Sequence, residues 1–305
     1  MNIQQLRYVV AIANSGTFRE AASKLFVSQP SLSVAIKDLE GELGFQIFTR
    51  TTTGAVLTSH GMTFYEKALE VVKSFDSFEK QFSQSSTDSD EFSIASQHYD
   101  FLPPLITTFS KAHPEHKDFR IFESTTIQIF DEVAQGDSEI GIIYLNNQNR
   151  KGLLQRMEKL GLEFVELIPF KTHIYLAKTH PLAQKESLVM EDLKELPTVR
   201  FTQEKDEYLY YSENFVDTSD SPHVFNVTDR ATLYGILERT DAYATGSGFL
   251  DSRSFNGITV IPLEDKLDNK MVYIKRRDKN LSVCALKFIA VMKDYFEKFS
   301  PKVTK

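Results

Sequence analysis

The spacing of hydrophobic residues in this chain changes once, near residue 91, and that change limits what the chain can fold into. Before it, apolar residues recur every three or four positions, as they do in amphipathic helices. After it, short β-type runs alternate with helical patterns, as in layered α/β domains. The 305 residues are about twice the length of a typical domain. We therefore expect a helical N-terminal domain followed by a larger α/β domain.

Residues 1–58 are expected to form three short helices and a two-stranded hairpin. The second helix begins at a capping box made by Thr17 and Glu20, whose side chains satisfy each other's backbone donors. Ser28 can cap a third helix, which tolerates Pro30 in its first turn. Two helices joined by a turn of three or four residues form a helix-turn-helix unit.

Polar residues at the start of the third helix suit contact with DNA, because the second helix of such a unit enters the major groove. Gln29 can pair with adenine, and Lys37 can reach guanine or phosphate. Hydroxyl and guanidinium groups in the expected hairpin would donate to phosphates. The candidate DNA-binding residues are Gln29, Pro30, Ser31, Ser33, Lys37, Arg50, Thr51 and Thr52. The spacing alone also fits a helical bundle with a polar, solvated face.

Residues 58–84 are expected to form one long helix with an apolar stripe. The stripe is close to a heptad seam and consists of Phe64, Ala68, Val71, Phe75, Phe78 and Phe82. A helix of this length cannot bury the stripe alone. Its partner would be the chain's own C-terminal domain or a second chain, and we favour the second chain. The polar segment Ser83–Glu91 is interpreted as a hinge.

The remaining residues favour α/β layers built on mostly parallel sheet. The expected strands are Phe92–Ser96, Phe119–Glu123, Ile140–Leu145, His173–Lys178, Val199–Phe201, Phe225–Thr228, Ala242–Thr245, Thr259–Leu263 and Lys270–Lys275. The expected helices between them include Leu102–Lys111, Ile127–Gln135 and Ala231–Glu238. The length of this region is comfortable for two sets of layers.

Composition and charge exclude several classes of protein. The net charge is −7, so a protein that coats nucleic acid without regard to sequence is not expected, and any DNA-binding face must be local. The one cysteine, Cys284, excludes an intrachain disulfide and a cysteine-rich zinc site. No apolar run approaches the roughly 18 residues of a membrane span, and no signal peptide is recognised. These features predict a cytoplasmic protein without membrane contact.

Motifs for catalysis, cofactors or metal ions are missing from the sequence. No P-loop pattern occurs, and Gly246-Ser247-Gly248 is only a fragment of a dinucleotide fingerprint. His113 and His116 lie three residues apart, but Pro114 between them disfavours a metal site. We therefore expect no enzyme activity, no cofactor and no bound metal.

The first 60 residues closely resemble the LysR-type transcriptional regulators. The matching stretches are Leu6-Arg7-Tyr8-Val9, Ser15-Gly16-Thr17-Phe18, Glu20-Ala21-Ala22, Leu25, Val27-Ser28-Gln29-Pro30-Ser31-Leu32-Ser33, Ile36-Lys37-Asp38-Leu39-Glu40, Leu43-Gly44, Phe48-Thr49-Arg50, Leu57-Thr58 and Gly61. Later stretches that look similar to the family are Leu102-Pro103-Pro104-Leu105 and His180-Pro181-Leu182-Ala183.

This resemblance implies three parts: a winged helix-turn-helix domain at 1–58, a linker helix and hinge at 59–90, and a two-lobed effector domain at 91–305 that is similar to periplasmic binding proteins. Lobe one is expected at 91–162 and 267–305, and lobe two at 163–266. The effector pocket would lie in the cleft between the lobes, where helix N-termini offer free donors. The candidate effector-binding residues are Ser96, Gln97, His98, Tyr99, Thr125, Thr126, Thr202, Thr228, Asp229, Thr245 and Gly246.

The leading hypothesis is a sequence-specific regulator that binds double-stranded operator DNA and a small-molecule effector, and that assembles as a dimer or tetramer. RNA polymerase is left open as a further partner. Because Asp229 could bind an ammonium group, we expect a small amino acid or a related carboxylate as effector; the chain also looks similar to family members that govern sulfur amino acid supply. The alternative is a small-molecule binding module whose helical N-terminus only dimerises, and an α/β enzyme is a third hypothesis.

Overall fold

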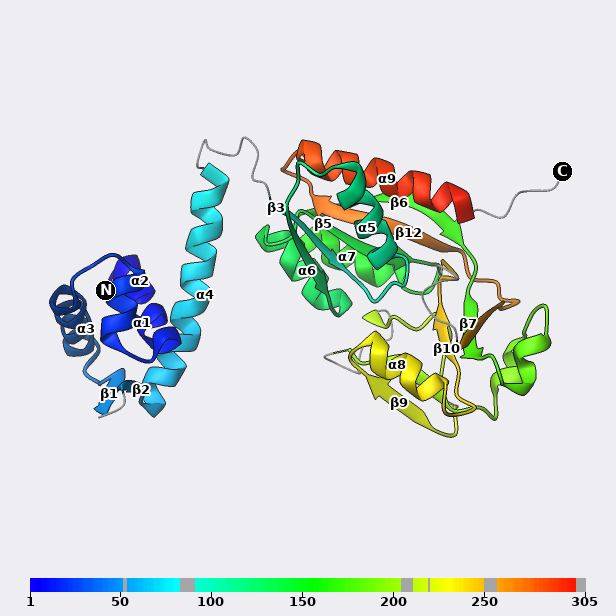
Figure 1. The fold of residues 1–305 in the computed structure, drawn as a ribbon, viewed down its shortest axis with the longest axis horizontal. Coiled ribbons are helices and arrows are strands. Elements are labelled where there is room, and N and C mark those ends of the chain that lie inside the picture. The colour runs from blue at the N-terminus through cyan, green and yellow to red at the C-terminus, as the bar shows by residue number, and fades with distance from the viewer. Residues whose placement is uncertain (52–53, 83–90, 204–210, 219, 250–256, 300–305) are drawn as a thin grey trace. The chain divides into compact units, whose positions relative to one another are not determined.

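The computed structural model describes residues 1–51, 54–82, 91–203, 211–218, 220–249 and 257–299 (Figure 1). The chain divides into two compact units, Met1–Thr87 and Asp88–Lys305. No helix within the described ranges is long and apolar enough to cross a membrane. The hinge expected at residues 83–91 lies almost wholly outside the described residues.

The N-terminal unit contains three short helices, a hairpin and a long helix. Their bounds are α1 (Ile3–Ser15), α2 (Phe18–Lys24), α3 (Gln29–Leu43), β1 (Phe48–Thr51), β2 (Gly54–Leu57) and α4 (Ser59–Phe82). The N-caps expected at Thr17 and Ser28 are present: the Thr17 side chain accepts from the Glu20 N–H, and the Ser28 side chain accepts from the Ser31 N–H. Only this half of the predicted capping box is formed, and the Glu20 carboxylate lies beside Lys24 instead. Leu32, Ile36 and Leu39 form the buried stripe of α3, so the predicted helix-turn-helix is confirmed.

The hairpin is joined to α3 by a carboxylate. Oε1 of Glu40 accepts from the backbone N–H groups of Ile47 and Phe48 at 2.7 and 3.1 Å. Gly61, in the first turn of α4, packs so closely on the Ile47 carbonyl that a Cβ at this position would overlap it. These contacts fix the hairpin and the start of α4 to the helix-turn-helix.

The apolar stripe of α4 is divided between two faces of the helix. Ala68 and Val72 are buried against Leu6 of α1, so the partner of this part is neither the C-terminal domain nor a second chain but α1 of the same unit. In contrast, Val71 and Phe78 are 49% and 57% exposed. The prediction of one continuous seam is therefore wrong, because α4 lies alongside α1 over part of its length (Figure 1).

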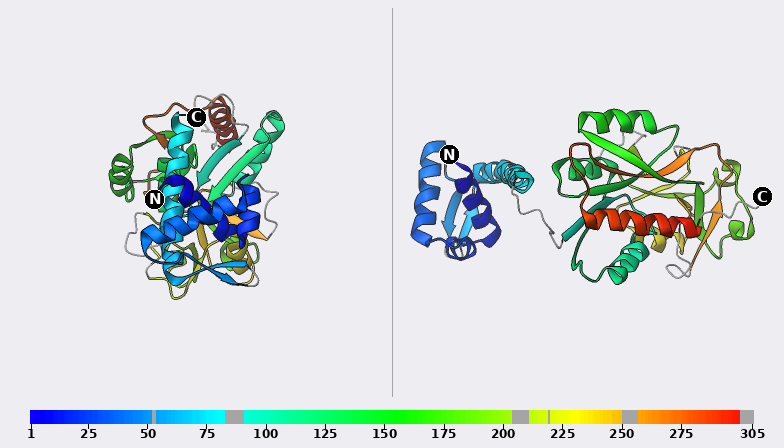
Figure 2. Two further views of the ribbon diagram at one scale, coloured as in Figure 1. Left: turned by 90° about the vertical axis from the view of Figure 1, so that its left-hand side faces the viewer. Right: turned by 90° about the horizontal axis from the view of Figure 1, so that it is seen from above.

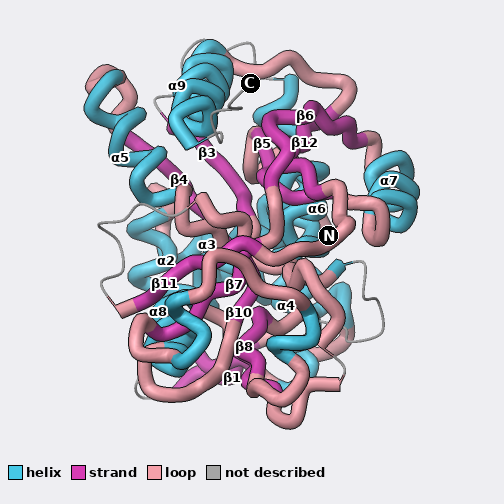
Figure 3. The backbone as a smooth tube through the Cα atoms, turned by 90° about the vertical axis from the view of Figure 1, so that its right-hand side faces the viewer, coloured by secondary structure: helices cyan, strands magenta, loops and turns pink. Residues whose placement is uncertain are grey.

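The first lobe of the C-terminal unit is a five-stranded sheet with helices on both faces. The strand order is β4-β3-β5-β12-β6. The bounds are β3 (Glu91–Ser96), α5 (Leu102–Ala112), β4 (Asp118–Glu123), α6 (Thr126–Gln135), β5 (Ile140–Leu145), α7 (Arg150–Lys159), β6 (Leu162–Phe170), β12 (Asn269–Arg276) and α9 (Val283–Phe299). One core lies under α5 and α9, and another under α6 and α7; α9 lies over its face of the sheet in Figure 2, and α7 beside β6 in Figure 3.

The second lobe is smaller and is built on two small sheets with the strand orders β10-β7-β11 and β8-β9. Its elements are β7 (His173–Ala177), η1 (Pro181–Gln184), η2 (Met190–Leu193), β8 (Thr198–Phe201), β9 (Val224–Val227), α8 (Arg230–Leu237), β10 (Ala244–Gly246) and β11 (Ile258–Pro262). Leu233 and Leu237 of α8 pack against Val199 and Val227 of β8 and β9. The core of this lobe thereby fixes α8, whose N-terminus faces the other lobe.

Two expectations for this unit are wrong. The sheets are mixed rather than mostly parallel: β3 pairs in parallel with β4 and β5, but β12 is antiparallel to β5 and β6, and β7 to β10 and β11. The crossover between lobes also lies after Phe170 rather than after residue 162, because β6 pairs with β12 along its whole length. All nine predicted strands are present, with ends within about two residues, whereas β6 was not predicted.

Candidate functional sites

The start of α3 presents an exposed polar face. Gln29, Pro30, Ser31 and Lys37 are exposed, and Ser33 is half-buried. Ser31 shares a hydrogen bond of 2.7 Å with the hydroxyl of the N-cap Ser28, so this serine also stabilises the first turn. The face is therefore accessible as the sequence predicts, and its polar groups project from a helix that is anchored on its other side.

The hairpin β1–β2 corresponds to the predicted wing. Arg50 pairs with Ala55 in its register, and Thr51 donates from its hydroxyl to the Gly54 carbonyl. Thr52 lies outside the described residues. The structure therefore confirms the strand pairing that the alternation predicted, while phosphate contacts by these side chains stay a prediction.

A pocket that is partly open to solvent lies between the two lobes of the C-terminal unit. It is lined from many segments: Gln97, His98, Tyr99, Asp100 and Tyr144 come from the first lobe, and Tyr175, Phe201, Glu213, Phe215, Arg230, Leu233, Tyr234, Ala244, Thr245, Gly246 and Ser247 from the residues between 173 and 262. Aromatic rings and charged groups of both signs therefore meet in one place.

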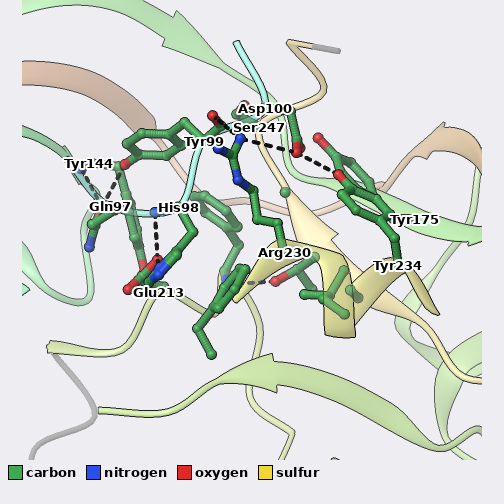
Figure 4. Close-up of a pocket in the computed structure, with 16 residues that line it drawn as sticks. Gln97, His98, Tyr99, Asp100, Tyr144, Tyr175, Glu213, Arg230, Tyr234 and Ser247 are labelled. Carbon is green, nitrogen blue, oxygen red and sulfur yellow. Dashed lines mark hydrogen bonds and ion pairs between the residues drawn. The ribbon is translucent and has the colours of Figure 1, made fainter. Parts of the chain in front are cut away.

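Arg230, at the first position of α8, bridges the lobes (Figure 4). Its guanidinium donates to the Tyr99 carbonyl at 2.7 Å and to Oε1 of Glu123 at 2.6 Å, and it lies 3.8 Å from Oδ1 of Asp100. The Tyr234 hydroxyl donates to the same Asp100 atom at 2.6 Å. Burial raises the pKa of Asp100, against the opposing effects of the Tyr234 hydrogen bond and the Arg230 charge. One cation is thus shared by two carboxylates.

A second charged pair lies on the other side of the pocket. Oε2 of Glu213 accepts from the backbone N–H of His98 at 3.0 Å and lies 2.9 Å from its Nδ1. The imidazole stacks on Phe201 with ring centroids 4.1 Å apart. Desolvation lowers the pKa of His98, but the hydrogen bond and charge of Glu213 outweigh it, so the net pKa is raised. The pair therefore favours a protonated imidazole.

Three tyrosine hydroxyls provide neutral donors around these charges. Burial raises the pKa of Tyr99, Tyr144 and Tyr175 above the usual value of the phenol, so each keeps its proton. Tyr99 donates to Oε1 of Gln97, whose Nε2 donates to the Thr126 hydroxyl at 2.7 Å. No group of three histidine, cysteine or acidic side chains among the described residues could hold a metal ion.

Comparison with known proteins decides the family. Residues 3–62 match the model of the bacterial regulatory helix-turn-helix protein, lysR family, and residues 88–297 match the LysR substrate binding domain. The chain belongs to the LysR family. It is accordingly a DNA-binding transcriptional regulator rather than an enzyme, as the sequence predicted.

Relatives and solved structures agree with this assignment. The chain is 28% identical over 258 residues to the HTH-type transcriptional regulator AlsR of Bacillus subtilis (strain 168), covering 83% of this chain and 81% of AlsR. It is 25% identical over 299 residues to the uncharacterized HTH-type transcriptional regulator YbhD of Escherichia coli (strain K12), covering 95% and 90%. The fold is similar to that of a full-length OxyR variant from Pseudomonas aeruginosa, with a TM-score of 0.55 and 22% identity over 96% and 98% of the two chains.

Five of the predicted effector-binding residues of this LysR-family chain line the pocket: Gln97, His98, Tyr99, Thr245 and Gly246. The other six do not line it. Ser96 is buried and donates to the Gln97 carbonyl, Thr125 caps α6, and Thr126 is buried and donates to the Tyr211 carbonyl. Thr202, Thr228 and Asp229 are exposed.

Asp229 was expected to bind an ammonium group, but its carboxylate caps α8 by accepting from the Thr232 N–H at 2.8 Å. The hydrogen bonds from Thr232 lower the pKa of this carboxyl.

The pocket residues that the sequence analysis missed include most of its charged groups. Asp100, Glu213 and Arg230 line the pocket but carried no motif. One signal was present: Arg230 stands in the first turn of α8, where a cation is unfavourable beside the helix dipole. Such a residue indicates a partner outside its own helix.

Proposed function

We propose that this LysR-type regulator binds a small zwitterionic amino acid in the pocket between its lobes. The observation that carries the proposal is the presence of Arg230 together with the carboxylates of Asp100 and Glu213 in one tyrosine-lined pocket. Arg230 suits a carboxylate, and the two acids suit an ammonium group. The amino-acid class predicted from the sequence is kept, but its ammonium partner changes from Asp229 to Asp100 and Glu213.

Binding of such a ligand would act on the contact between the lobes. The ligand carboxylate competes with Glu123 for Arg230, and this exchange alters the link from α8 to the first lobe. A ligand shifts a conformational equilibrium only by its differential affinity for two states. The exchange of partners at Arg230 supplies such a difference, which would change how the regulator holds its operator.

The DNA side of the proposal rests on α3. Gln29, Ser31, Ser33 and Lys37 would contact base edges and phosphates, and Arg50 of the hairpin the flanking backbone. Two copies would read the half-sites of a symmetric operator, since symmetric proteins read symmetric sites. The exposed Val71 and Phe78 of α4 lie seven residues apart on one helix face, which suits pairing with a second copy. Location in the cytoplasm and contact with RNA polymerase belong to the same proposal.

Calorimetry of the full chain with each of the twenty amino acids tests the ligand. We expect binding of a small subset, and a loss of tenfold or more in affinity for Arg230→Met. Arg239→Met is the matched control, because Arg239 lies beyond the other end of α8, is exposed and is outside the pocket lining. Glu213→Gln should weaken the same ligand. Binding of simple carboxylates without an amino group, unaffected by Glu213→Gln, would contradict the proposal.

A further inference from the structure

A large apolar side chain stands exposed in the turn of the helix-turn-helix. Phe26 is 97% exposed, and its φ is +55°. A hydrogen bond from the Val27 N–H to the Ala22 carbonyl closes the C-terminal end of α2. This closing pattern requires the left-handed conformation at Phe26, the residue just before Val27. Glycine or asparagine adopts it at less cost than phenylalanine. Phe26 is thus unfavourable for the isolated fold in both exposure and conformation.

A second exposed apolar side chain lies on the recognition helix itself. Val34 is 58% exposed. It lies four residues after Pro30 and three before Lys37, on the same face as the polar residues that are proposed to read DNA. The opposite face carries the buried stripe of α3, so Val34 makes no contribution to that core. The exposed face is therefore polar with an apolar margin, which we define as Phe26 and Val34.

We propose that this apolar margin contacts operator DNA: Val34 packs on the methyl group of a thymine, and Phe26 on the deoxyribose edge beside it. Thymine is the base that presents a methyl group in the major groove, and small apolar side chains contact it there. The turn before a recognition helix lies next to the strand backbone when the helix enters the groove. The inference rests on the proposed entry of α3 into the groove and adds a base preference to it.

Removing single methyl groups from the DNA tests Val34. A duplex is first selected from random sequence with the full-length protein, and each thymine is then replaced in turn by uracil. One replacement in each half-site should weaken binding roughly fourfold, which is the effect expected for one buried methyl group. Val34→Ala should bind the thymine duplex more weakly by a similar factor and should be insensitive to that replacement. The assignment of Val34 is wrong if no uracil replacement changes affinity. It is also wrong if Val34→Ala still loses affinity on the uracil duplex by the same factor as the unaltered chain, so that the effects of the two changes multiply.

Phe26→Asn separates binding from folding. Asparagine relieves the left-handed strain, so the melting temperature should hold or rise while the affinity for selected and random DNA falls about fivefold. The salt dependence should not change, because an apolar contact releases no counterions. Phe26→Tyr, which keeps the ring, should bind like the unaltered chain. Unchanged affinity of Phe26→Asn overturns the assignment of Phe26.

Gln29→Ala distinguishes this inference from the proposal on which it rests. If Gln29→Ala weakens the selected duplex and the apolar-margin variants do not, only the inference fails. If none of the three variants weakens binding, entry of α3 into the groove fails as well.

Discussion

The DNA-reading face and the interlobe pocket differ in how their residues come together. The polar residues of the DNA-reading face lie within nine positions on one helix, Gln29–Lys37. The helical period of α3 alone brings them to the same surface. The pocket is lined from four strands, a helix and several connecting segments between residues 97 and 247. A local site can be predicted from spacing, whereas a site assembled from distant segments depends on a topology that spacing does not give.

The two sites also differ in burial, and this difference governs what substitutions should do. Apart from Ser31, which bonds to the N-cap Ser28, the side chains of α3 that point outward contribute little to the fold. Their replacement should therefore change DNA binding at nearly constant stability. The charged groups of the pocket are buried or half-buried and are paired, so their replacement should change ligand binding and stability together. The following substitutions, at both sites and on neighbouring helices, test whether DNA binding and ligand binding can be changed separately. They are given from the largest expected effect to the smallest.

Arg230→Met should produce the largest effect on stability. The side chain of Arg230 is 18% exposed, and its loss removes the cation that pairs with Glu123 and Asp100. Breaking a buried pair costs about 3–5 kcal/mol, and the loss here should approach the lower end because both side chains of the Arg230–Glu123 pair are partly exposed. Thermal unfolding of the C-terminal unit, measured with Arg239→Met as control, should show this loss. A melting temperature equal to that of the control would mean that the interlobe bridge contributes nothing to stability.

Phe78→Asp should disrupt assembly. It places a charge in the face that Val71 and Phe78 offer to a second copy, and an unpaired charge in such an interface costs several kcal/mol. Sedimentation should detect smaller species and weaker operator binding. Met62→Asp is the control, because Met62 is also exposed but lies on the opposite side of α4 from Val71. The proposal of a dimer through this face fails if both variants sediment like the unaltered chain.

Gln29→Ala should lower the affinity for the selected operator by about 1–3 kcal/mol while leaving random DNA nearly unaffected. Arg50→Ala should instead weaken all sequences alike and reduce the salt slope by about one. Fluorescence anisotropy at several salt concentrations compares the two variants. Equal loss of Gln29→Ala on both kinds of DNA would count against base reading.

Thr125→Val should lower stability by about 1 kcal/mol through the loss of the α6 cap. The concentration of ligand needed for half-maximal response should not change, because Thr125 does not line the pocket. Melting curves and ligand titrations on the same preparation check both statements. A change in half-maximal concentration at constant melting temperature would bring Thr125 back into the binding site.

The pH dependence of stability should report the pair of His98 and Glu213. Because the folded-state pKa of His98 is raised, its contribution is complete below the unfolded-state pKa of about 6.5 and is lost as the pH rises through the folded-state value. The melting temperature of the C-terminal unit should therefore be higher at pH 6 than at pH 8, and His98→Gln should reduce this difference. His223→Gln, at an exposed position, is the control that should retain it.

The sequence predicted most of the local structure because short-range rules determine it. The caps at Thr17 and Ser28 are fixed by side chains that accept from backbone groups three residues away. The strand β6 was missed, and with it the position of the lobe boundary, because its pairing with β12 joins residues about a hundred positions apart. Long-range pairing leaves no trace in local periodicity.

Pocket residues were predicted correctly only where they follow the end of a strand or lie at it. Gln97, His98 and Tyr99 come directly after β3, and in this topology the residues beyond the carboxyl end of a strand face the cleft. Glu213 comes from an irregular segment that no periodicity describes, and Tyr144 lies inside β5, where it resembles an ordinary core residue. Asp229 shows the reverse error, since a residue suited to a ligand serves as a cap.

DNA reading is proposed to belong to α3 and ligand binding to the interlobe pocket, each in its own compact unit. Both affinities should therefore be measured on the full chain carrying Gln29→Ala and on the full chain carrying Glu213→Gln, with the amino acid that calorimetry identifies. We predict that Gln29→Ala lowers operator affinity about fivefold or more and leaves the ligand affinity of the DNA-free protein within twofold. Glu213→Gln should lower ligand affinity and leave operator affinity without ligand unchanged. A Gln29→Ala chain that loses ligand affinity as strongly as operator affinity would be incompatible with two separate sites.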